Sequence, residues 1–144
     1  MVFIINYATE TLEAPYKTND AAIYSIAVNE AFCVIGSMDS YLRVWPLDLQ
    51  DFFMEAQHEG IVSSVDISND GLKVACGTMN GSIGVLDKSN QGYKTLLRSH
   101  TDEIIAIDYH KLKNNIISVS ADRTIRLWDL DTLEEVYEFS SPID

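Results

Sequence analysis

Residue types that could do chemistry gather near the end of the chain: His100, Ser118 or Ser120, and Asp122. A serine, a histidine and an aspartate are the components of a hydrolase triad, in which the imidazole takes the proton of the serine hydroxyl. No glycine motif that could form an oxyanion hole accompanies the serine. The 22 residues from His100 to Asp122 also recur from His58 to Asn80. The residues therefore follow a repeat, and the chain is predicted not to be an enzyme.

The repeat has a period of about forty residues. Its strongest copy, Leu127-Trp128-Asp129-Leu130, aligns with Val44-Trp45-Pro46-Leu47, with Val85-Leu86-Asp87-Lys88 and, more weakly, with Ile4-Ile5-Asn6-Tyr7. The spacings from Ile5 to Trp45, Leu86 and Trp128 are 40, 41 and 42. Units of this length cannot bury their apolar faces alone and must stack on their neighbours. A closed ring of four-stranded sheets needs about four to eight of them. The chain is therefore expected to be a piece of a longer protein.

Alternation of apolar residues and turn signals divide the chain into short strands. Four units follow from the repeat: residues 1–18, which hold two strands, then 19–57, 58–99 and 100–144, which hold four each. The predicted strands are 2–6 and 12–17; 23–28, 32–36, 42–45 and 52–56; 62–67, 73–77, 82–86 and 94–98; and 104–109, 116–120, 125–128 and 135–139. Pro46 ends one strand where a ladder N–H is no longer needed. Asn69-Asp70-Gly71 predicts a tight hairpin, because Asp and Gly tolerate positive φ.

The segment from Ser120 to Asp129, with His100 placed 22 residues before Asp122, resembles the signature of WD-repeat β-propellers. The resemblance implies an all-β propeller fragment with three complete four-stranded blades and half of a preceding blade. In that family a loop His, a Ser or Thr on the second strand, a turn Asp and a third-strand Trp form a hydrogen-bonded tetrad. The matching residues here are His100, Ser118 (with Ser120 as the less favoured alternative), Asp122 and Trp128.

The two other complete units depart from this tetrad. In residues 58–99, His58 and Asn80 match, but Cys76 replaces the hydroxyl and Leu86 replaces the tryptophan. In residues 19–57, Asp39 and Trp45 match, no His precedes them, and Asn19 is the nearest candidate. We expect partial networks in both units. Cys33 and Cys76 fall on predicted inner strands, where buried thiols are common, and no metal site or cofactor is expected.

A narrower resemblance points to function. The segments 41–48, 55–65 and 98–101, with Trp45-Pro46 in place of Trp-Asp, resemble the large WD-repeat proteins of the centriole and basal-body wall. This resemblance implies a non-catalytic protein–protein interaction scaffold in a centriolar, basal-body or axonemal microtubule assembly, with a cytoplasmic, cytoskeletal location. The alternative is an adaptor that recognises a peptide or modified tail, such as a ubiquitin-ligase substrate receptor or a chromatin reader.

By analogy with other WD-repeat propellers, partner contacts are expected on the face that carries the loops before the first strands and the turns between second and third strands. The candidates are Tyr24, Met38, Ser63, Met79 and Ile105. The net charge of −12 argues against nucleic acid and anionic membranes as partners, and it argues against assigning tubulin contact to this segment. No stretch is long and apolar enough to cross a bilayer, and no small-molecule substrate is expected.

Overall fold

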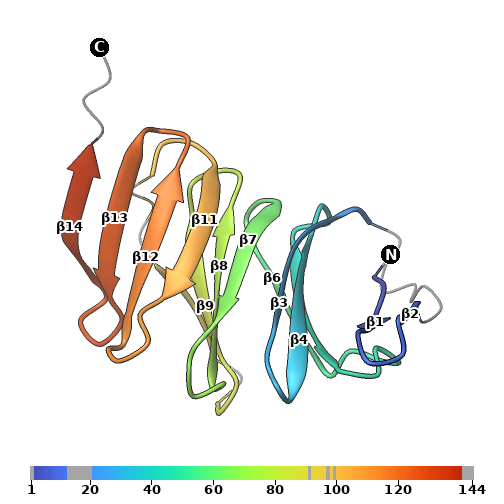
Figure 1. The fold of residues 1–144 in the computed structure, drawn as a ribbon. Coiled ribbons are helices and arrows are strands. Elements are labelled where there is room, and N and C mark those ends of the chain that lie inside the picture. The colour runs from blue at the N-terminus through green and yellow to red at the C-terminus, as the bar shows by residue number, and fades with distance from the viewer. Residues whose placement is uncertain (1, 13–20, 91, 97, 99, 141–144) are drawn as a thin grey trace.

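The computed structural model describes residues 2–12, 21–90, 92–96, 98 and 100–140, and every regular element in them is a β-strand (Figure 1). The strands form one two-stranded and three four-stranded antiparallel sheets. The hairpin is β1 (Ile5–Asn6) and β2 (Thr11–Leu12), and the first large sheet is β3 (Ile23–Val28), β4 (Phe32–Ser37), β5 (Tyr41–Pro46) and β6 (Met54–Gln57). The second is β7 (Val62–Ile67), β8 (Lys73–Thr78), β9 (Ile83–Asp87) and β10 (Gly92–Leu96), and the third is β11 (Ile104–Tyr109), β12 (Asn115–Ser120), β13 (Thr124–Asp129) and β14 (Glu134–Ser140).

The order of strands within each large sheet is the order along the chain, as the repeat predicts. The first strand of each four-stranded unit has the predicted bounds, whereas the predicted strand 2–6 is limited to Ile5–Asn6. Two outer strands are shifted. The predicted 52–56 begins at Met54, after a loop in which Phe52 packs edge-on against Trp45 with ring centroids 5.3 Å apart. The predicted 94–98 begins at Gly92, which pairs with Asp87 across a short turn. Residues 13–17 of the predicted strand 12–17 lie outside the described residues.

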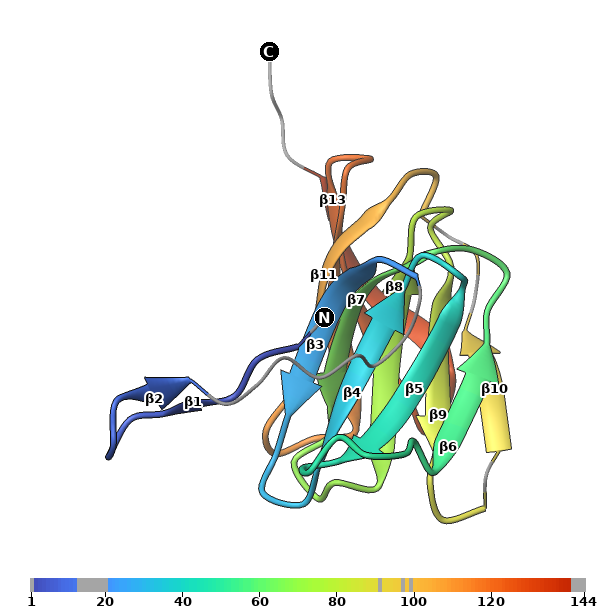
Figure 2. The ribbon, with the colours of Figure 1, turned by 90° about the vertical axis from the view of Figure 1, so that its right-hand side faces the viewer.

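The three large sheets pack face to face, and β7 lies between β3 and β11 (Figures 1 and 2). Val34, Val44 and Phe32 of the β3–β6 sheet meet Val65 and Val74 of the β7–β10 sheet in one apolar cluster. On the other face of the β7–β10 sheet, a second cluster continues to the β11–β14 sheet. Its members are Ala75, Ile83 and Val85 from the middle sheet and Ile104, Ile107, Tyr109, Ile116, Trp128 and Leu130 from the last. The middle sheet is therefore buried on both faces, and the core consists of two seams.

Two glycines allow the sheets to approach closely at these seams. A Cβ on Gly36 would lie 2.5 Å from Val62 Cγ1, and one on Gly77 would lie 2.4 Å from Ile104 Cγ2. Val62 and Ile104 begin the first strands of the following sheets, and both are fully buried. Since any side chain larger than hydrogen would force the strands apart, glycine at these two positions sets the spacing of the sheets.

The β1–β2 hairpin stands away from the three sheets (Figure 2). Val2 and Ile4, just before it, pack against a third cluster that contains Cys33, Ile35 and Trp45 on the outer face of the β3–β6 sheet. That cluster shows how the N-terminal segment is held to the remainder of the chain by apolar burial.

Candidate functional site

The predicted tetrad residues come from four elements and lie together in the β11–β14 sheet. Trp128 Nε1 on β13 donates to Ser118 Oγ on β12 at 2.9 Å. His100, in the loop before β11, has its Nε2 2.7 Å from the same hydroxyl. Its Nδ1 lies 2.9 Å from Asp122 Oδ2 in the β12–β13 turn. Because the indole can only donate and the carboxylate only accepts, the consistent order is Trp N–H to Ser O–H to His Nε2, with His Nδ1–H to Asp.

Asp122 is the most heavily hydrogen-bonded member of this network. Its carboxylate accepts from the backbone N–H groups of Thr101, at 3.1 Å, and Thr124, at 2.9 Å, and from Thr124 Oγ1 at 2.6 Å. Burial alone raises the pKa of Asp122. The hydrogen bonds from Thr124 and His100 outweigh burial and hold the pKa well below its usual range. The carboxylate is therefore ionised at neutral pH and ties the loop before β11 to the β12–β13 turn.

The geometry of the tetrad does not suit nucleophilic chemistry. Ser118 is fully buried, and the side chain of His100 has no exposed surface. The serine oxygen already accepts the indole N–H, so a substrate carbonyl has no route to it. The alternative residue, Ser120, is engaged elsewhere: its Oγ donates to Asp102 O at 3.1 Å and accepts from Asp122 N at 3.1 Å.

The corresponding residues of the β7–β10 sheet make a different set of contacts. Cys76 Sγ lies 3.3 Å from His58 Nδ1 and 3.4 Å from His58 Nε2. Asn80 Oδ1 accepts from Thr78 Oγ1 and, at 3.4 Å, from Ser82 N. Burial lowers the pKa of His58 to about 4 and raises that of Cys76 to about 12, so the ring and the thiol are both neutral at pH 7. The contact between them is therefore one between a neutral thiol and a neutral imidazole, with no ion pair.

The β3–β6 sheet uses Asp39 differently. Its carboxylate accepts from Ser37 Oγ and from Tyr41 N, and it forms an ion pair with Arg43 at 2.8 Å. Trp45 is buried, but its Nε1 has no hydrogen-bond partner among the described residues. Ile35 stands four residues before Asp39, as Ser118 stands four before Asp122, so an aliphatic side chain replaces the acceptor of the indole N–H. Asn19, the candidate for the missing histidine, lies outside the described residues.

One feature of all three sheets was not found by sequence reasoning. In each sheet the turn after the second strand donates a backbone N–H to the loop before the first strand. The bonds are Met38 N to Ala22 O at 2.8 Å, Met79 N to Ile61 O at 2.9 Å and Ala121 N to Glu103 O at 2.9 Å. Because any residue other than proline can make such a bond, no side-chain signal marks it.

The candidate partner-binding residues occupy repeated positions at this end of the sheets. Tyr24, Ser63 and Ile105 are each the extra residue of a β-bulge in the first strand of their sheet. Tyr24 and Ile105 are 49% and 58% exposed. Ser63 is half-buried, and its Oγ donates to Ile104 O across the seam at 2.6 Å. A bulge re-aims its extra side chain, which explains why an apolar residue can point outward from an inner strand.

Met38 and Met79 precede the Asp39 and Asn80 turns, close to these bulges. Met38 is 53% exposed, whereas Met79 is half-buried. The structure thus leaves Tyr24, Met38 and Ile105 as the most accessible of the five candidates. In the part of the chain that the structure describes, no group of three or more His, Cys, Asp or Glu residues could hold a metal, and no helix could span a bilayer.

Comparison with known proteins gives the following similarities. The family model described as "WD domain, G-beta repeat" matches residues 52–87 and 92–129. The chain is 48% identical over 120 residues to WD repeat-containing protein 90 of Xenopus tropicalis, which covers 83% of this chain and 6% of that protein. It is 42% identical over 99 residues to Centriole proteome protein 16 of Chlamydomonas reinhardtii, covering 69% of this chain and 5% of that protein. The chain therefore spans less than a tenth of these relatives.

Solved structures establish the architecture. The structure described as RRP9 WD40 repeats superposes with a TM-score of 0.79 at 17% sequence identity, covering 88% of this chain and 41% of that one. A structure of U3-55K superposes with a TM-score of 0.80 at the same identity. At this level of identity the likeness concerns the fold alone. The predicted all-β propeller fold, built from a fragment with three complete four-stranded sheets, is confirmed.

Proposed function

The chain belongs to the WD-repeat family, and from this premise we propose that it is a non-catalytic scaffold for protein–protein interaction in a centriolar, basal-body or axonemal microtubule assembly. The observation that carries the location is the 42% identity to Centriole proteome protein 16 over 69% of the chain. The similarity to WD repeat-containing protein 90 adds weight to a long repeat protein as the context. A location in the cytoplasmic cytoskeleton follows from this proposal.

The contacts within the tetrad support a non-catalytic role in this proposal. Its serine is fully buried and its histidine is held between two partners, so both serve the fold. A polar chain of this kind stabilises a loop because each buried donor and acceptor finds a partner. Accessible apolar side chains at the same end of the sheets, such as Tyr24, Met38 and Ile105, suit contact with another protein.

We place the partner surface at the bulges and the adjoining turns, where Tyr24, Met38 and Ile105 are exposed and Ser63 and Met79 lie between them in the repeat. Aromatic and methionine side chains are enriched at protein interfaces, because they bury much apolar area and adapt to the partner. Burial of these apolar side chains against a partner would contribute to its affinity.

Imaging of the full-length protein with a fluorescent tag tests the location. A signal at centrioles, basal bodies or axonemes supports the proposal. A diffuse or nuclear signal with none at these structures contradicts it and favours the adaptor function instead.

The partner surface is tested by co-precipitation from ciliated cells. The double variant Tyr24→Ser, Ile105→Ser should lose partners that the wild-type protein retains. Leu72→Ser is the matched control, because Leu72 is 50% exposed but lies in the turn at the other end of β7 and β8. Equal losses in the control variant would contradict the placement of the surface without affecting the imaging result.

A further inference from the structure

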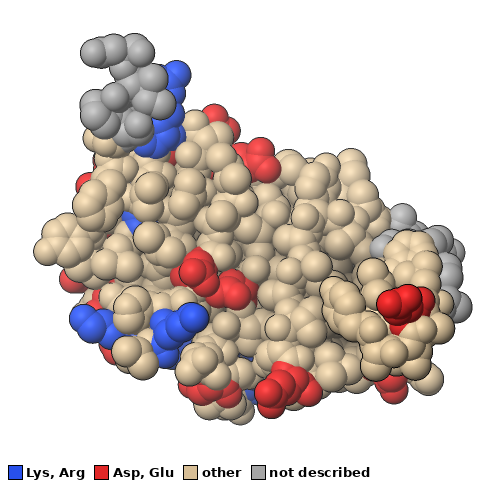
Figure 3. All heavy atoms as spheres, in the orientation of Figure 1, with Lys and Arg blue, Asp and Glu red and all other residues tan. Residues whose placement is uncertain are grey.

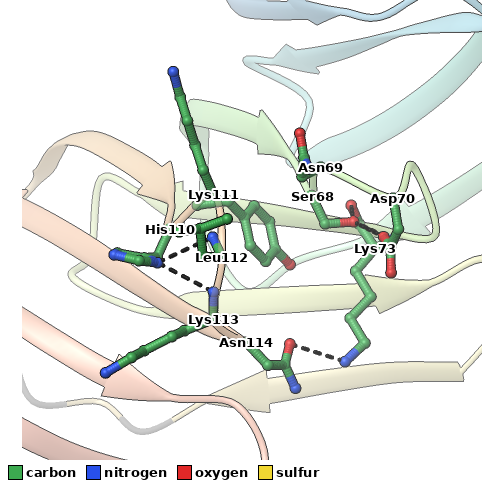
Figure 4. A pocket seen from close by; sticks show the side chains of 10 residues that line it. Ser68, Asn69, Asp70, Lys73, His110, Lys111, Leu112, Lys113 and Asn114 are labelled. Carbon is green, nitrogen blue, oxygen red and sulfur yellow. Dashed lines mark hydrogen bonds between the residues drawn. The ribbon is translucent and has the colours of Figure 1, made fainter.

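A cavity of about 400 Å³ opens at the other ends of the strands, between the β7–β8 turn and the β11–β12 turn. It lies across the seam between the β7–β10 and β11–β14 sheets, so residues about forty positions apart in the sequence meet there. Its lining includes Lys73, Lys111, Lys113 and His110 (Figure 4). The partner surface proposed above lies at the opposite end of these sheets, and the present inference does not depend on it.

The charge of this cavity runs against the charge of the chain. Three of the six lysines in the sequence line it, although the chain carries a net charge of −12. Asp70 is the one carboxylate in the lining. Its Oδ1 accepts from Ser68 Oγ at 2.6 Å and from Leu72 N at 3.0 Å within its own turn, and its charge also interacts with that of Lys73. Among the described residues, no carboxylate forms an ion pair with Lys111 or Lys113.

Local hydrogen bonds fix the turn that carries Lys111 and Lys113, and another holds the side chain of Lys73. His110 Nδ1 accepts from the backbone N–H groups of Leu112, at 3.2 Å, and Lys113, at 3.1 Å, and this closes the turn after β11. Figure 4 shows Lys111 and Lys113 leaving this turn in different directions. Lys73 reaches across the seam to Asn114 Oδ1 at 3.1 Å. Because Lys111 and Lys113 extend outward from the turn (Figure 4), the three ammonium groups are spread apart rather than focused on one point.

Spread cations with an apolar neighbour fit an extended chain with several negative charges better than a single small anion. Leu112, at the tip of the same turn, is 90% exposed. We propose that this cavity is a docking site for an acidic segment of a partner protein, whose carboxylates pair with Lys73, Lys111 and Lys113 while an apolar side chain packs on Leu112. Figure 3 shows blue atoms at the lower end of the β11–β14 sheet, beside a face on which most atoms belong to uncharged residues.

The equivalent cavity between the β3–β6 and β7–β10 sheets lacks this character. It is lined by one lysine, Lys88, together with Glu30 and Asp70. The Lys88 ammonium lies 3.5 Å from the centre of the Phe32 ring and donates to Gly71 O at 3.3 Å. The two carboxylates in this lining outnumber its single lysine, so this cavity is not basic. The basic cavity is a property of one seam and not of the repeat, which is what a specific site requires.

A long polyanion suits the cavity less well than a short acidic segment. Beyond the lysines, a nucleic-acid backbone would approach Asp70 and also Asp108, which lines the adjoining hollow on the other side of the β11–β12 turn. These carboxylates, together with the net charge of the chain, repel a continuous row of phosphates. A peptide can place its carboxylates at the lysines and uncharged residues opposite the aspartates.

Fluorescence anisotropy of the full-length protein tests the proposal, with a labelled peptide of alternating Glu and Leu as the probe. We expect saturable binding that weakens about three- to tenfold in the double variant Lys111→Gln, Lys113→Gln, because exposed ion pairs contribute modestly. The double variant Arg98→Gln, Arg123→Gln is the matched control: it removes the same charge at the opposite end of the sheets. The variant Lys111→Arg, Lys113→Arg should keep the wild-type affinity.

Several outcomes would overturn the proposal. The first is no saturable binding of the Glu–Leu peptide by the wild-type protein. The second is an equal loss in the arginine control variant, which would mean that net charge alone matters. The third is binding of labelled oligo(dT) that is as tight as that of the peptide, or full competition by inorganic phosphate. A peptide with Lys in place of Glu should not bind.

Discussion

The β7–β10 and β11–β14 sheets have the same strands, the same turns and the same backbone bond between turn and loop, but they fasten the loop with different side chains. In the last sheet a serine hydroxyl joins an indole to an imidazole, and a carboxylate completes the chain. In the middle sheet Cys76 meets His58 at 3.3 Å, and Leu86 fills the place of the tryptophan. The fold therefore does not need the polar chain, since apolar packing and the shared backbone bond suffice for the architecture.

The difference also shows what each set of side chains demands. The buried N–H of Trp128 has its acceptor in Ser118, and an unpaired buried donor would destabilise the fold. Where leucine stands instead, a thiol is sufficient. The β3–β6 sheet gives the intermediate case: Trp45 is present without an acceptor among the described residues, beside Ile35. The polar network is a property of the whole set of residues and not of any one of them.

Removal of the Ser118 hydroxyl should have the largest effect. In Ser118→Ala both His100 Nε2 and Trp128 Nε1 lose a buried partner, and we expect a loss of about 3 kcal/mol in the local free energy of opening. Hydrogen exchange measured by mass spectrometry should show faster exchange of β12 and β13 amides by about two orders of magnitude. Ser120→Ala on the same strand is the control and should cost about 1 kcal/mol. A greater cost for Ser120→Ala would contradict the assignment of Ser118 as the centre of the network.

Acid should destabilise the β7–β10 sheet more than the β11–β14 sheet. The pKa of His58 is about 4 in the folded protein and about 6.5 when unfolded, so the unfolded chain binds more protons in between. The contribution of neutral His58 to the stability of the β7–β10 sheet is therefore fully present above pH 6.5, and it is lost as the pH falls through about 4. Asp122, whose pKa lies well below its usual range, remains ionised over this window. Hydrogen exchange at pH 7 and pH 4.5 should show selective opening of β7 and β8, and His58→Gln should remove that pH dependence. Equal opening of both sheets in acid would argue against this mechanism.

The turns after β8 and β12 should differ in how much a substitution at their left-handed position changes stability. Gly81 has φ +82°, and a Cβ there would lie 2.3 Å from His100 O, so the loop that carries the tetrad histidine rests on the turn of the preceding sheet. Gly81→Ala should destabilise the protein by about 2 kcal/mol through backbone strain and displacement of this loop. Arg123 has φ 72° at the equivalent position but is exposed, and Arg123→Gly should change stability by less than about 0.5 kcal/mol. Thermal unfolding measures both, and similar effects would show that the loop does not rest on Gly81.

The first strand of each four-stranded unit could be predicted from sequence with correct bounds, because its apolar residues are flanked by clear turn residues. Two outer strands begin two residues away from their predicted starts, since side-chain contacts such as Phe52 on Trp45 shape the loop before the strand and do not follow from alternation in the sequence. The tetrad residues could be named because the sequence resembles the WD-repeat signature, with Ser120 left as an alternative to Ser118. Their distances could not, and neither could the cavity with Lys73, Lys111 and Lys113, because it forms only when two units pack.

The smallest expected effect comes from exchanging the sulfur of Cys76 and the hydroxyl oxygen of Ser118 between the two sheets. Cys76→Ser puts a hydroxyl beside His58, whose ring can accept a hydrogen bond from it. The side chain of Leu86 has no N–H or O–H that would need an acceptor. Stability should change by less than about 1 kcal/mol. The reciprocal Ser118→Cys should cost about 1 to 2 kcal/mol, because sulfur is a poor acceptor for the Trp128 N–H. Urea unfolding of the two variants measures the asymmetry. If the exchanges cost the same, then the residue at position 86 or 128 does not decide how polar the centre of each sheet must be, and the comparison between the sheets loses its physical basis.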